Sequence, residues 1–249
     1  MTGGRRLLEG QRGDRSLVSI ITVVFQARQE LTTLLESISS WRGAALEIIV
    51  IDAGSRDGTV DVLREWNSVI DYWVSEPDGG IYDAMNKGVA AASGEYILHL
   101  NAGDQLLRLP LEELTSCLTG GVDAACFAVD VAGFGIHRPR TGFMLHFVNT
   151  LHHQGTFYRL ATHMGYDARY RIYGDFDLNQ RMMKTRKRVR LFDLVVSRQV
   201  TVGVSGDRST DAEQYVLIKR NFGRPYILLA RVWRYLTPAL LKVKRLLNR

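Results

Sequence analysis

The sequence predicts an α/β fold, with a mostly parallel sheet, flanking helices and an amphipathic helical segment at the C-terminus. Two observations predict it. Hydrophobic β-branched runs alternate with helical patterns through the first hundred residues, as they do in parallel βαβ units. Polar residues follow the predicted strands, at the edge where open α/β sheets bind ligands. The 249 residues, 46% of them hydrophobic, suffice to bury the core of such a domain.

The elements up to residue 100 follow from local patterns. Residues 17–25 (LVSIITVVF) form a near-continuous apolar run, which is typical of a strand buried on both faces. Residues 31–41 repeat large apolar side chains at three-to-four spacing, which predicts a helix. The same reasoning predicts strands at 46–51, 70–75 and 96–100 and helices at 59–66 and 81–92. Because these strands alternate with helices, we expect them to lie parallel in one sheet.

After residue 105 the pattern is looser. It predicts a helix at 111–118, the start of a helix in Gly174–Lys184, strands at 122–131 and 189–196, and irregular structure at 133–150. Residues 1–15 are rich in Gly and Arg without periodicity, and they lack the apolar core of a signal peptide. They are predicted to form a loose leader, and the protein is predicted to be cytoplasmic.

The net charge of +6 is concentrated near the C-terminus. Nine Lys or Arg residues and no acidic residue lie between Lys219 and Arg249, which leaves residues 1–218 with a net charge of −3. A mildly acidic body argues against nucleic acid as a partner. The two cysteines, Cys117 and Cys126, are too few for a disulfide framework and lack zinc-ligand spacing, so we expect buried thiols.

The predicted sheet lacks both common phosphate-binding loops. The turn after the first strand, residues 26–29 (QARQ), has no glycine, and no G-x-x-x-x-G-K-[ST] occurs. A nucleotide site without such a loop can hold diphosphate through a divalent metal bound by carboxylates. Asp52, residues 76–78 and residues 101–104 all fall at predicted strand ends and supply the polar groups for such a site.

Several motifs, in order, resemble those of glycosyltransferase family 2. Residues 52–59 (DAGSRDGT) are similar to the family's D-x-G-S-x-D-G-T, and residues 76–88 (EPDGGIYDAMNKG) to its D-x-G-I-Y-D-A-M-N-K-G stretch. Further matches follow at 93–96 (SGEY), 100–104 (LNAGD), 153–157 (HQGTF) and 174–178 (GDFDL). The resemblance covers residues 16–205 and implies a GT-A fold, which is Rossmann-like, and inverting transfer of a sugar from a nucleotide-sugar donor.

One position departs from the usual family pattern. Family members usually carry D-x-D after the fourth strand, whereas this chain reads Asn101, Ala102, Gly103, Asp104, which resembles a branch with N-x-G-D. The resemblance implies that Asp104 and Asn101 hold Mg²⁺ or Mn²⁺ together with the donor diphosphate. An amide oxygen can bind a metal but brings no charge, so we expect a lower metal affinity.

The resemblance also implies donor-side residues. Asp52 would hold the nucleoside, and Asp83 and Lys87 would face the nucleotide. Each has an alternative role. Asp52 begins a Gly-Ser turn, and its carboxylate could accept hydrogen bonds from the backbone N–H groups of that turn. Asp83 and Lys87 could lie on a solvated helix face.

The candidate catalytic base is Asp175. An acceptor hydroxyl must lose its proton as the new bond forms, and a carboxylate within hydrogen-bond reach can accept it. Asp175 could also cap the helix that follows. His153 and Gln154 resemble the family's acceptor-side loop, although a histidine in this setting could equally be structural.

The segment 226–249 predicts a basic amphipathic helix. It is too charged to span a membrane, so the pattern favours a membrane-surface element, with packing on the protein's own body as the alternative. Pro238 is expected to kink or split the helix. The apolar positions are Leu229, Val232, Leu236, Leu240, Val243 and Leu247, opposite basic positions Arg231, Arg234, Lys242, Arg245 and Arg249.

These inferences predict a metal-dependent, inverting glycosyltransferase of the hexosyl- or N-acetylhexosaminyl-transferase class. Its donor would be UDP-linked, and its acceptor a glycan or lipid-linked hydroxyl in surface polysaccharide synthesis, at the inner face of the cell membrane. The predicted domains are a leader (1–15), a GT-A domain (16–205) and a basic helical tail (206–249). The alternatives are a sugar nucleotidyltransferase, whose G-x-G-T-R loop is missing, and a catalytically silent glycan- or membrane-binding module.

Overall fold

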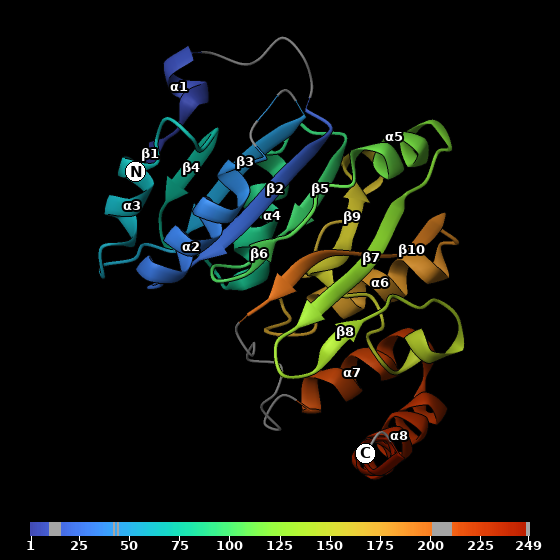
Figure 1. Ribbon diagram of the computed structural model, residues 1–249. Helices are drawn as coiled ribbons and strands as arrows, with labels where there is room; N and C mark the ends of the chain where they lie inside the picture. Colours follow the sequence, from blue (N-terminus) through green and yellow to red (C-terminus); the bar gives the residue numbers. More distant parts are fainter. Residues whose placement is uncertain (10–15, 42, 44, 201–210, 248–249) are drawn as a thin grey trace.

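In the computed structural model, which describes residues 1–9, 16–41, 43, 45–200 and 211–247, the chain folds around one ten-stranded mixed sheet (Figure 1). The strand order is β1-β4-β3-β2-β5-β9-β7-β10-β6, and β8 pairs with β7 beside this path. The strands are β1 (Thr2–Gly3), β2 (Val18–Val24), β3 (Leu46–Asp52), β4 (Tyr72–Ser75), β5 (Tyr96–His99), β6 (Gln105–Leu106), β7 (Ala124–Val131), β8 (Gly135–His137), β9 (Thr156–Arg159) and β10 (Val189–Gln199).

The centre of the sheet is parallel, as the alternation of strands and helices predicts. β2 lies between β3 and β5 in parallel register, and β3 pairs in parallel with β4. Val24 stands opposite Asp52, and Asp52 opposite Ser75, so the carboxyl ends of β2, β3 and β4 meet at one edge. The predicted polar strand ends therefore lie together.

Helices cover both faces of the sheet and divide the core into two apolar clusters. One cluster takes buried side chains from α2 and α5, such as Leu34 and Leu114; the other takes them from α4, α6 and α7, such as Met85, Phe176 and Leu217. The helices are α1 (Arg5–Glu9), α2 (Arg28–Ser39), α3 (Thr59–Glu65), α4 (Ile81–Ala91), α5 (Leu111–Thr119), α6 (Gly174–Lys184), α7 (Asp211–Phe222) and α8 (Arg224–Leu247), with 3-10 turns η1 (Phe143–His146), η2 (His153–Gly155) and η3 (Leu160–Thr162).

The prediction of a loose leader over residues 1–15 is wrong for residues 1–9. Thr2 and Gly3 add an antiparallel strand to β4, and the N-terminal ammonium donates to the Ser75 carbonyl at 2.8 Å. Arg6, in α1, forms an ion pair with buried Glu47. A two-residue strand and a buried ion pair leave no periodic signal, which is why the pattern did not reveal them. Residues 10–15 lie outside the described part of the chain.

The predicted separation of a tail beginning at residue 206 also needs correction. α7 packs on α6, and its Leu217 and Ile218 are fully buried in the core. Figure 1 shows α7 beneath the sheet, with α8 continuing away from it. α8 runs unbroken from Arg224 to Leu247, so Pro238 does not split it. Residues 201–210 lie outside the described part. Among the described helices, none is long and apolar enough to cross a bilayer.

Smaller differences concern the middle of the chain. The region predicted as irregular, 133–150, contains β8 and η1, and β9 was not predicted. The helix start predicted in Gly174–Lys184 is confirmed, because α6 begins at Gly174. Both cysteines are free and buried, as expected.

Candidate functional site

Asp52 ends β3 at the edge where the parallel strands terminate. Its carboxylate is fully buried and accepts hydrogen bonds from the backbone N–H groups of Gly54 and Ser55, at 3.1 and 3.0 Å. The hydroxyls of Ser55 and Ser75 donate to the same carboxylate. The geometry therefore favours the backbone-bonding role that the sequence left open, because no oxygen of Asp52 is exposed to a nucleoside.

Asp83 and Lys87 lie one turn apart on α4, near the end of β4. The Lys87 ammonium bonds Glu76 at 2.8 Å and lies 3.7 Å from the Asp83 carboxylate, which also accepts the N–H of Gly79. Hydrogen bonding to Glu76, with a smaller contribution from Asp83, raises the pKa of Lys87. Lys87 is thus a cation at the sheet edge, and a phosphate reaching it would compete with Glu76.

Asn101 and Asp104 form a tight turn directly after β5. Asp104 is fully buried; one of its oxygens accepts the backbone N–H of Asn101 at 3.0 Å. Its other oxygen, Oδ1, and the side-chain Oδ1 of Asn101 are buried and accept no hydrogen bond from the described residues. Burial raises the pKa of Asp104 to about 6, against an opposing effect of nearby His153.

These two oxygens fit a divalent cation only in part. No group of three or more His, Cys, Asp or Glu side chains that could hold a metal occurs among the described residues. Proteins commonly supply only one or two ligands to Mg²⁺ when substrate phosphates and water supply the others, and one carboxylate with one amide oxygen matches that number. The buried, unused oxygens of Asn101 and Asp104 are what such a shared cation would require.

A row of side chains joins this turn to Asp175. The Asn101 amide nitrogen lies 3.2 Å from His153 Nε2, and His153 Nδ1 lies 3.2 Å from Asp175 Oδ2. The contacts agree if the Asn101 amide donates to Nε2 while the Nδ1–H of His153 donates to the carboxylate. His153 therefore connects the turn after β5, where the metal is predicted to bind, with the predicted base Asp175 on α6.

The two oxygens of Asp175 are used differently. Oδ2 accepts from His153 and from the Asn149 amide at 3.1 Å, whereas Oδ1 accepts the N–H of Phe176 at 2.7 Å. The Tyr82 hydroxyl lies 3.4 Å from Oδ1, but its single proton is better placed on the carbonyl of Ile172, at 2.5 Å. Oδ1 thus keeps a lone pair for an incoming hydroxyl, and the side chain is 12% exposed.

Gln154 is buried and is not exposed to an acceptor. The residue is 2% exposed, and its carbonyl accepts from the hydroxyl of Ser197 in β10. Its side chain lies against Asp104, where its hydrogen bonding lowers the pKa of that carboxyl and partly offsets the effect of burial. Gln154 therefore supports the turn after β5 and contacts the site from behind.

Sequence reasoning missed Glu213, which holds the loop in front of the base. Its carboxylate accepts the backbone N–H groups of Arg171, Ile172 and Tyr173, at 2.9, 2.9 and 2.8 Å. These residues immediately precede α6, which carries Asp175 in its first turn. Because Glu213 stands about forty residues later, in the segment read as a tail, no local motif could have identified it.

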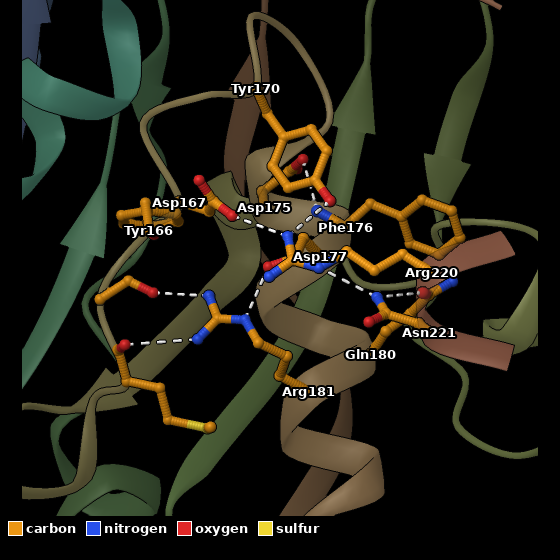
Figure 2. A network of polar contacts seen from close by, with 12 residues as sticks. Tyr166, Asp167, Tyr170, Asp175, Phe176, Asp177, Gln180, Arg181, Arg220 and Asn221 are labelled. Carbon is orange, nitrogen blue, oxygen red and sulfur yellow. Dashed lines mark hydrogen bonds and ion pairs between the residues drawn. The ribbon is translucent and has the colours of Figure 1, made fainter. Parts of the chain in front are cut away.

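Figure 2 shows a second set of contacts between α6 and α7. Arg220 donates to Asp167 at 2.8 Å, and Asn221 donates to Asp177 at 3.1 Å. Asp177 also pairs with Arg181, whose guanidinium reaches the carbonyls of residues 164 and 165. Hydrogen bonds from Arg169 and Arg220 hold the pKa of Asp167 well below its usual range. α7 thus fixes both the loop before the base and the helix that carries it.

The structure brings Asn101, Asp104, His153 and Asp175 into one connected polar row. Asp83 and Lys87 lie on α4, whose Tyr82 reaches the neighbourhood of Asp175. The carboxylate of Asp175, which has an available lone pair, can accept a proton from a hydroxyl. The nearby turn, with the unused buried oxygens of Asn101 and Asp104, can hold a cation beside a negatively charged leaving group.

Comparison with known proteins identifies relatives in sequence and in fold. The family described as glycosyl transferase family 2 matches residues 19–187. An uncharacterized glycosyltransferase of Mycobacterium tuberculosis is 43% identical over 89 residues, which are 35% of this chain and 34% of that protein. The chain thus aligns with about a third of that relative's length. A PGL/p-HBAD biosynthesis glycosyltransferase of Mycobacterium bovis is 27% identical over 236 residues, 87% of this chain and 91% of that protein.

Solved structures share the fold. S. aureus TarS 1-349 in complex with UDP-GlcNAc has a TM-score of 0.64 at 15% identity, covering 80% of this chain and 64% of that one. The mannosyltransferase PcManGT from Pyrobaculum calidifontis, in complex with GDP-Man and Mn²⁺, has a TM-score of 0.64 at 17% identity, covering 93% and 75%. At these identities the likeness extends to the fold, which is that of a GT-A domain.

Proposed function

The chain belongs to glycosyl transferase family 2, and on that premise we propose that it transfers a sugar, with inversion, from a UDP-linked donor to an acceptor hydroxyl. The acceptor would be a glycan or a lipid-linked saccharide of surface polysaccharide synthesis. The observation that carries the proposal is the row from Asn101 through His153 to Asp175, which joins a donor-side turn to a carboxylate with an available lone pair.

In this mechanism Asp175 Oδ1 accepts the proton of the acceptor hydroxyl. As that oxygen bonds to the anomeric carbon of the donor sugar, the bond from this carbon to the diphosphate breaks, and the diphosphate leaves from the opposite face. His153 and Asn149 hold Oδ2, so they orient the carboxylate while Oδ1 reacts. A general base of this kind contributes about 10²–10⁴-fold to the rate.

Asp104 and Asn101 are the residues that would hold Mg²⁺ or Mn²⁺. Such a cation, when bound, neutralises the negative charge that develops on the departing diphosphate. The unused Oδ1 atoms of both side chains support this assignment. Lys87 and Asp83 would complete the donor side, with Lys87 exchanging Glu76 for a phosphate oxygen.

A membrane-surface role for α8 rests on which of its faces is covered. Tyr226, Ile227 and Trp233 are partly buried against the body, together with buried Ala230. Of the predicted apolar stripe, the three positions whose side chains the structure describes are not covered: Leu229, Val232 and Leu236 are 38%, 48% and 50% exposed. Exposed apolar side chains on a basic helix favour binding at an anionic bilayer surface, which here would be the inner face of the cell membrane.

The test is direct detection of transfer. Purified protein with Mn²⁺ and a panel of UDP-, GDP- and dTDP-sugars is incubated with a lipid-linked saccharide acceptor, and the anomeric configuration of the product is read by NMR. We expect one donor class to give product of inverted configuration. A UDP-sugar that binds without any product forming would favour the catalytically silent module, as the missing carboxylates at positions 101 and 103 do.

A further inference from the structure

A cavity of about 230 Å³ lies between α6, which carries Asp175, the turn η1 and the strands β7 and β10. Its apolar lining comes from Ala124, Leu145, Leu151, Met182, Met183 and Val189. An apolar cavity of roughly 150 Å³ already accommodates a benzene-sized molecule. This cavity therefore has room for a ring or a short stretch of a lipid chain.

Burial distinguishes the floor of the cavity from its mouth. Ala124, Leu145 and Leu151 are at most 2% exposed and form the floor. Thr141 is exposed, and Met183 and Val189 are partly exposed, so the cavity opens between α6 and β10. Lys187 also lines it and lies on the turn that joins these two elements.

The polar group on the floor needs no ligand. The Asn179 side-chain oxygen accepts the hydroxyl of Tyr158 at 2.9 Å, and its nitrogen donates to Asn149 and to the Leu151 carbonyl, both at 3.0 Å. An occupant therefore gains by burying apolar surface against the floor, with no hydrogen bond to make there. Asn149 in turn donates to Asp175 at 3.1 Å, so this wall also supports the candidate base.

The turn beside the mouth is rich in cations. Five of the seven residues from Lys184 to Arg190 are Lys or Arg and none is acidic; Lys187 lines the cavity, whereas Arg190 donates to Ser116 in α5 and Lys184 lies over the ring of Phe222. Asp123 faces this turn, where it lies 3.6 Å from the Lys187 ammonium and accepts the N–H of Arg188. Lys184 and Arg186 are exposed. An apolar cavity with a cationic entrance matches an amphiphile that carries a phosphate beside an apolar chain.

We propose that this cavity binds the apolar chain of a phosphate-linked lipid acceptor, with the phosphate against the turn 184–190. The site continues the proposed membrane face: η1, which supplies Leu145, also carries Phe143, 58% exposed and 6.1 Å from the ring of Tyr226 in α8. The statement that the bound lipid is an acceptor rests on the proposed transferase function. Binding of the lipid's apolar chain in the cavity does not depend on that function.

Calorimetric titration of the full chain with decyl phosphate tests the proposal. We expect saturable binding, with at least tenfold weaker binding of glycerol phosphate, which lacks the chain, and of decanol, which lacks the phosphate. Val189→Phe fills the mouth and should weaken decyl phosphate binding at least tenfold. Leu191→Phe, the same kind of change two residues along β10, should leave it unchanged.

A charge variant tests the entrance. The double variant Lys184→Gln, Arg186→Gln should weaken decyl phosphate binding several-fold, whereas Arg108→Gln, at another exposed position, should not. Absence of binding to the wild type, or equal binding by Val189→Phe of unchanged melting temperature, overturns the inference. UDP binding measured on the same wild-type sample distinguishes that failure from failure of the transferase proposal.

A final comparison separates an acceptor from a bilayer lipid. With a decyl-phosphate-linked saccharide as acceptor, Val189→Phe should raise KM for the acceptor at least fivefold and leave binding to vesicles containing phosphatidylglycerol unchanged. If the variant instead loses vesicle binding and keeps the acceptor KM, a bilayer lipid occupies the cavity and the proposal is wrong.

Discussion

The two regions to which we assign the donor and the acceptor, called the donor half and the acceptor half, are built in different ways. The donor half comprises β2 to β5 with α2 to α4. Here each polar residue follows its own strand, and the parallel pairing of neighbouring strands brings these residues together at one edge of the sheet. In the acceptor half, Asp175 is held by Asn149 and His153, and the loop before it by Glu213. The first arrangement can be inferred from local pattern, whereas the second depends on contacts between distant segments.

The largest expected effect belongs to the acceptor half. Asp175→Asn should reduce the rate of transfer by about 10²–10⁴-fold, because an amide cannot accept the hydroxyl proton. Binding of the nucleotide should remain, since Asp175 makes no contact with the described strand ends β2 to β4. Steady-state kinetics together with calorimetry checks both parts. Asp193→Asn, an exposed carboxylate on β10, is the control, and equal losses in both variants would contradict the assignment.

Next comes the donor half. Asp104→Asn removes the carboxylate from the turn after β5, and metal-dependent nucleotide affinity should fall by about 10–100-fold, as expected for a contact with a charged group worth roughly 1.5–3 kcal/mol. Titration of UDP with and without Mn²⁺ measures it, with Asp61→Asn on the exposed face of α3 as control. An unchanged dependence on Mn²⁺ would show that the cation is held elsewhere.

Glu213 tests whether α7 belongs to the acceptor half. Glu213→Gln should lower kcat by about tenfold, equivalent to roughly 1.4 kcal/mol, because the loop before α6 loses its charged acceptor. The KM for the donor and the melting temperature should both stay unchanged, whereas a general loss of stability would lower the melting temperature together with the apparent kcat. Glu112→Gln, exposed on α5, is the matched control. Equal kcat values for Glu213→Gln and the wild type would make α7 a structural support only.

The smallest effect is on stability. Burial lowers the pKa of His152 to about 3 and that of His163 to about 4, below the ordinary 6.5. The unfolded chain therefore binds more protons than the native chain between pH 6.5 and about 4, so the free energy of unfolding falls as pH falls through this range. Urea titrations at pH 7 and pH 5 measure it. His163→Gln should show a smaller difference, and an equal difference would assign the effect to other groups.

How much of the molecule could be predicted follows the same division. The predicted strands at 17–25 and 46–51 correspond to β2 and β3, because strands buried on both faces carry continuous apolar runs. The start of α6 was predicted because the residues that follow Gly174 carry their own helical pattern. Asn101 and Asp175 were both named, yet the sequence could not show that His153 connects them, since their partners lie on separate elements.

The errors have physical reasons too. Residues 1–9 read as a loose leader because β1 contributes only two residues, and its position depends on pairing with β4. α7 was assigned to a basic tail together with the cation-rich segment that follows it, whereas its fully buried Leu217 and Ile218 decide where it packs. For Asp52 both roles agreed with the sequence, and the pattern could not show that the hydroxyls of Ser55 and Ser75 donate to its carboxylate.

One measurement tests most directly the claim that the two halves have separate roles. The melting temperatures of the wild type, Asp104→Asn and Asp175→Asn are recorded with UDP, GDP, dTDP and CMP, each with and without Mn²⁺, since a ligand that binds the native state raises the melting temperature. We predict a Mn²⁺-dependent increase with UDP in the wild type, an equal increase in Asp175→Asn and a much smaller one in Asp104→Asn. No increase with any nucleotide, or loss of the increase in Asp175→Asn alone, would contradict the account.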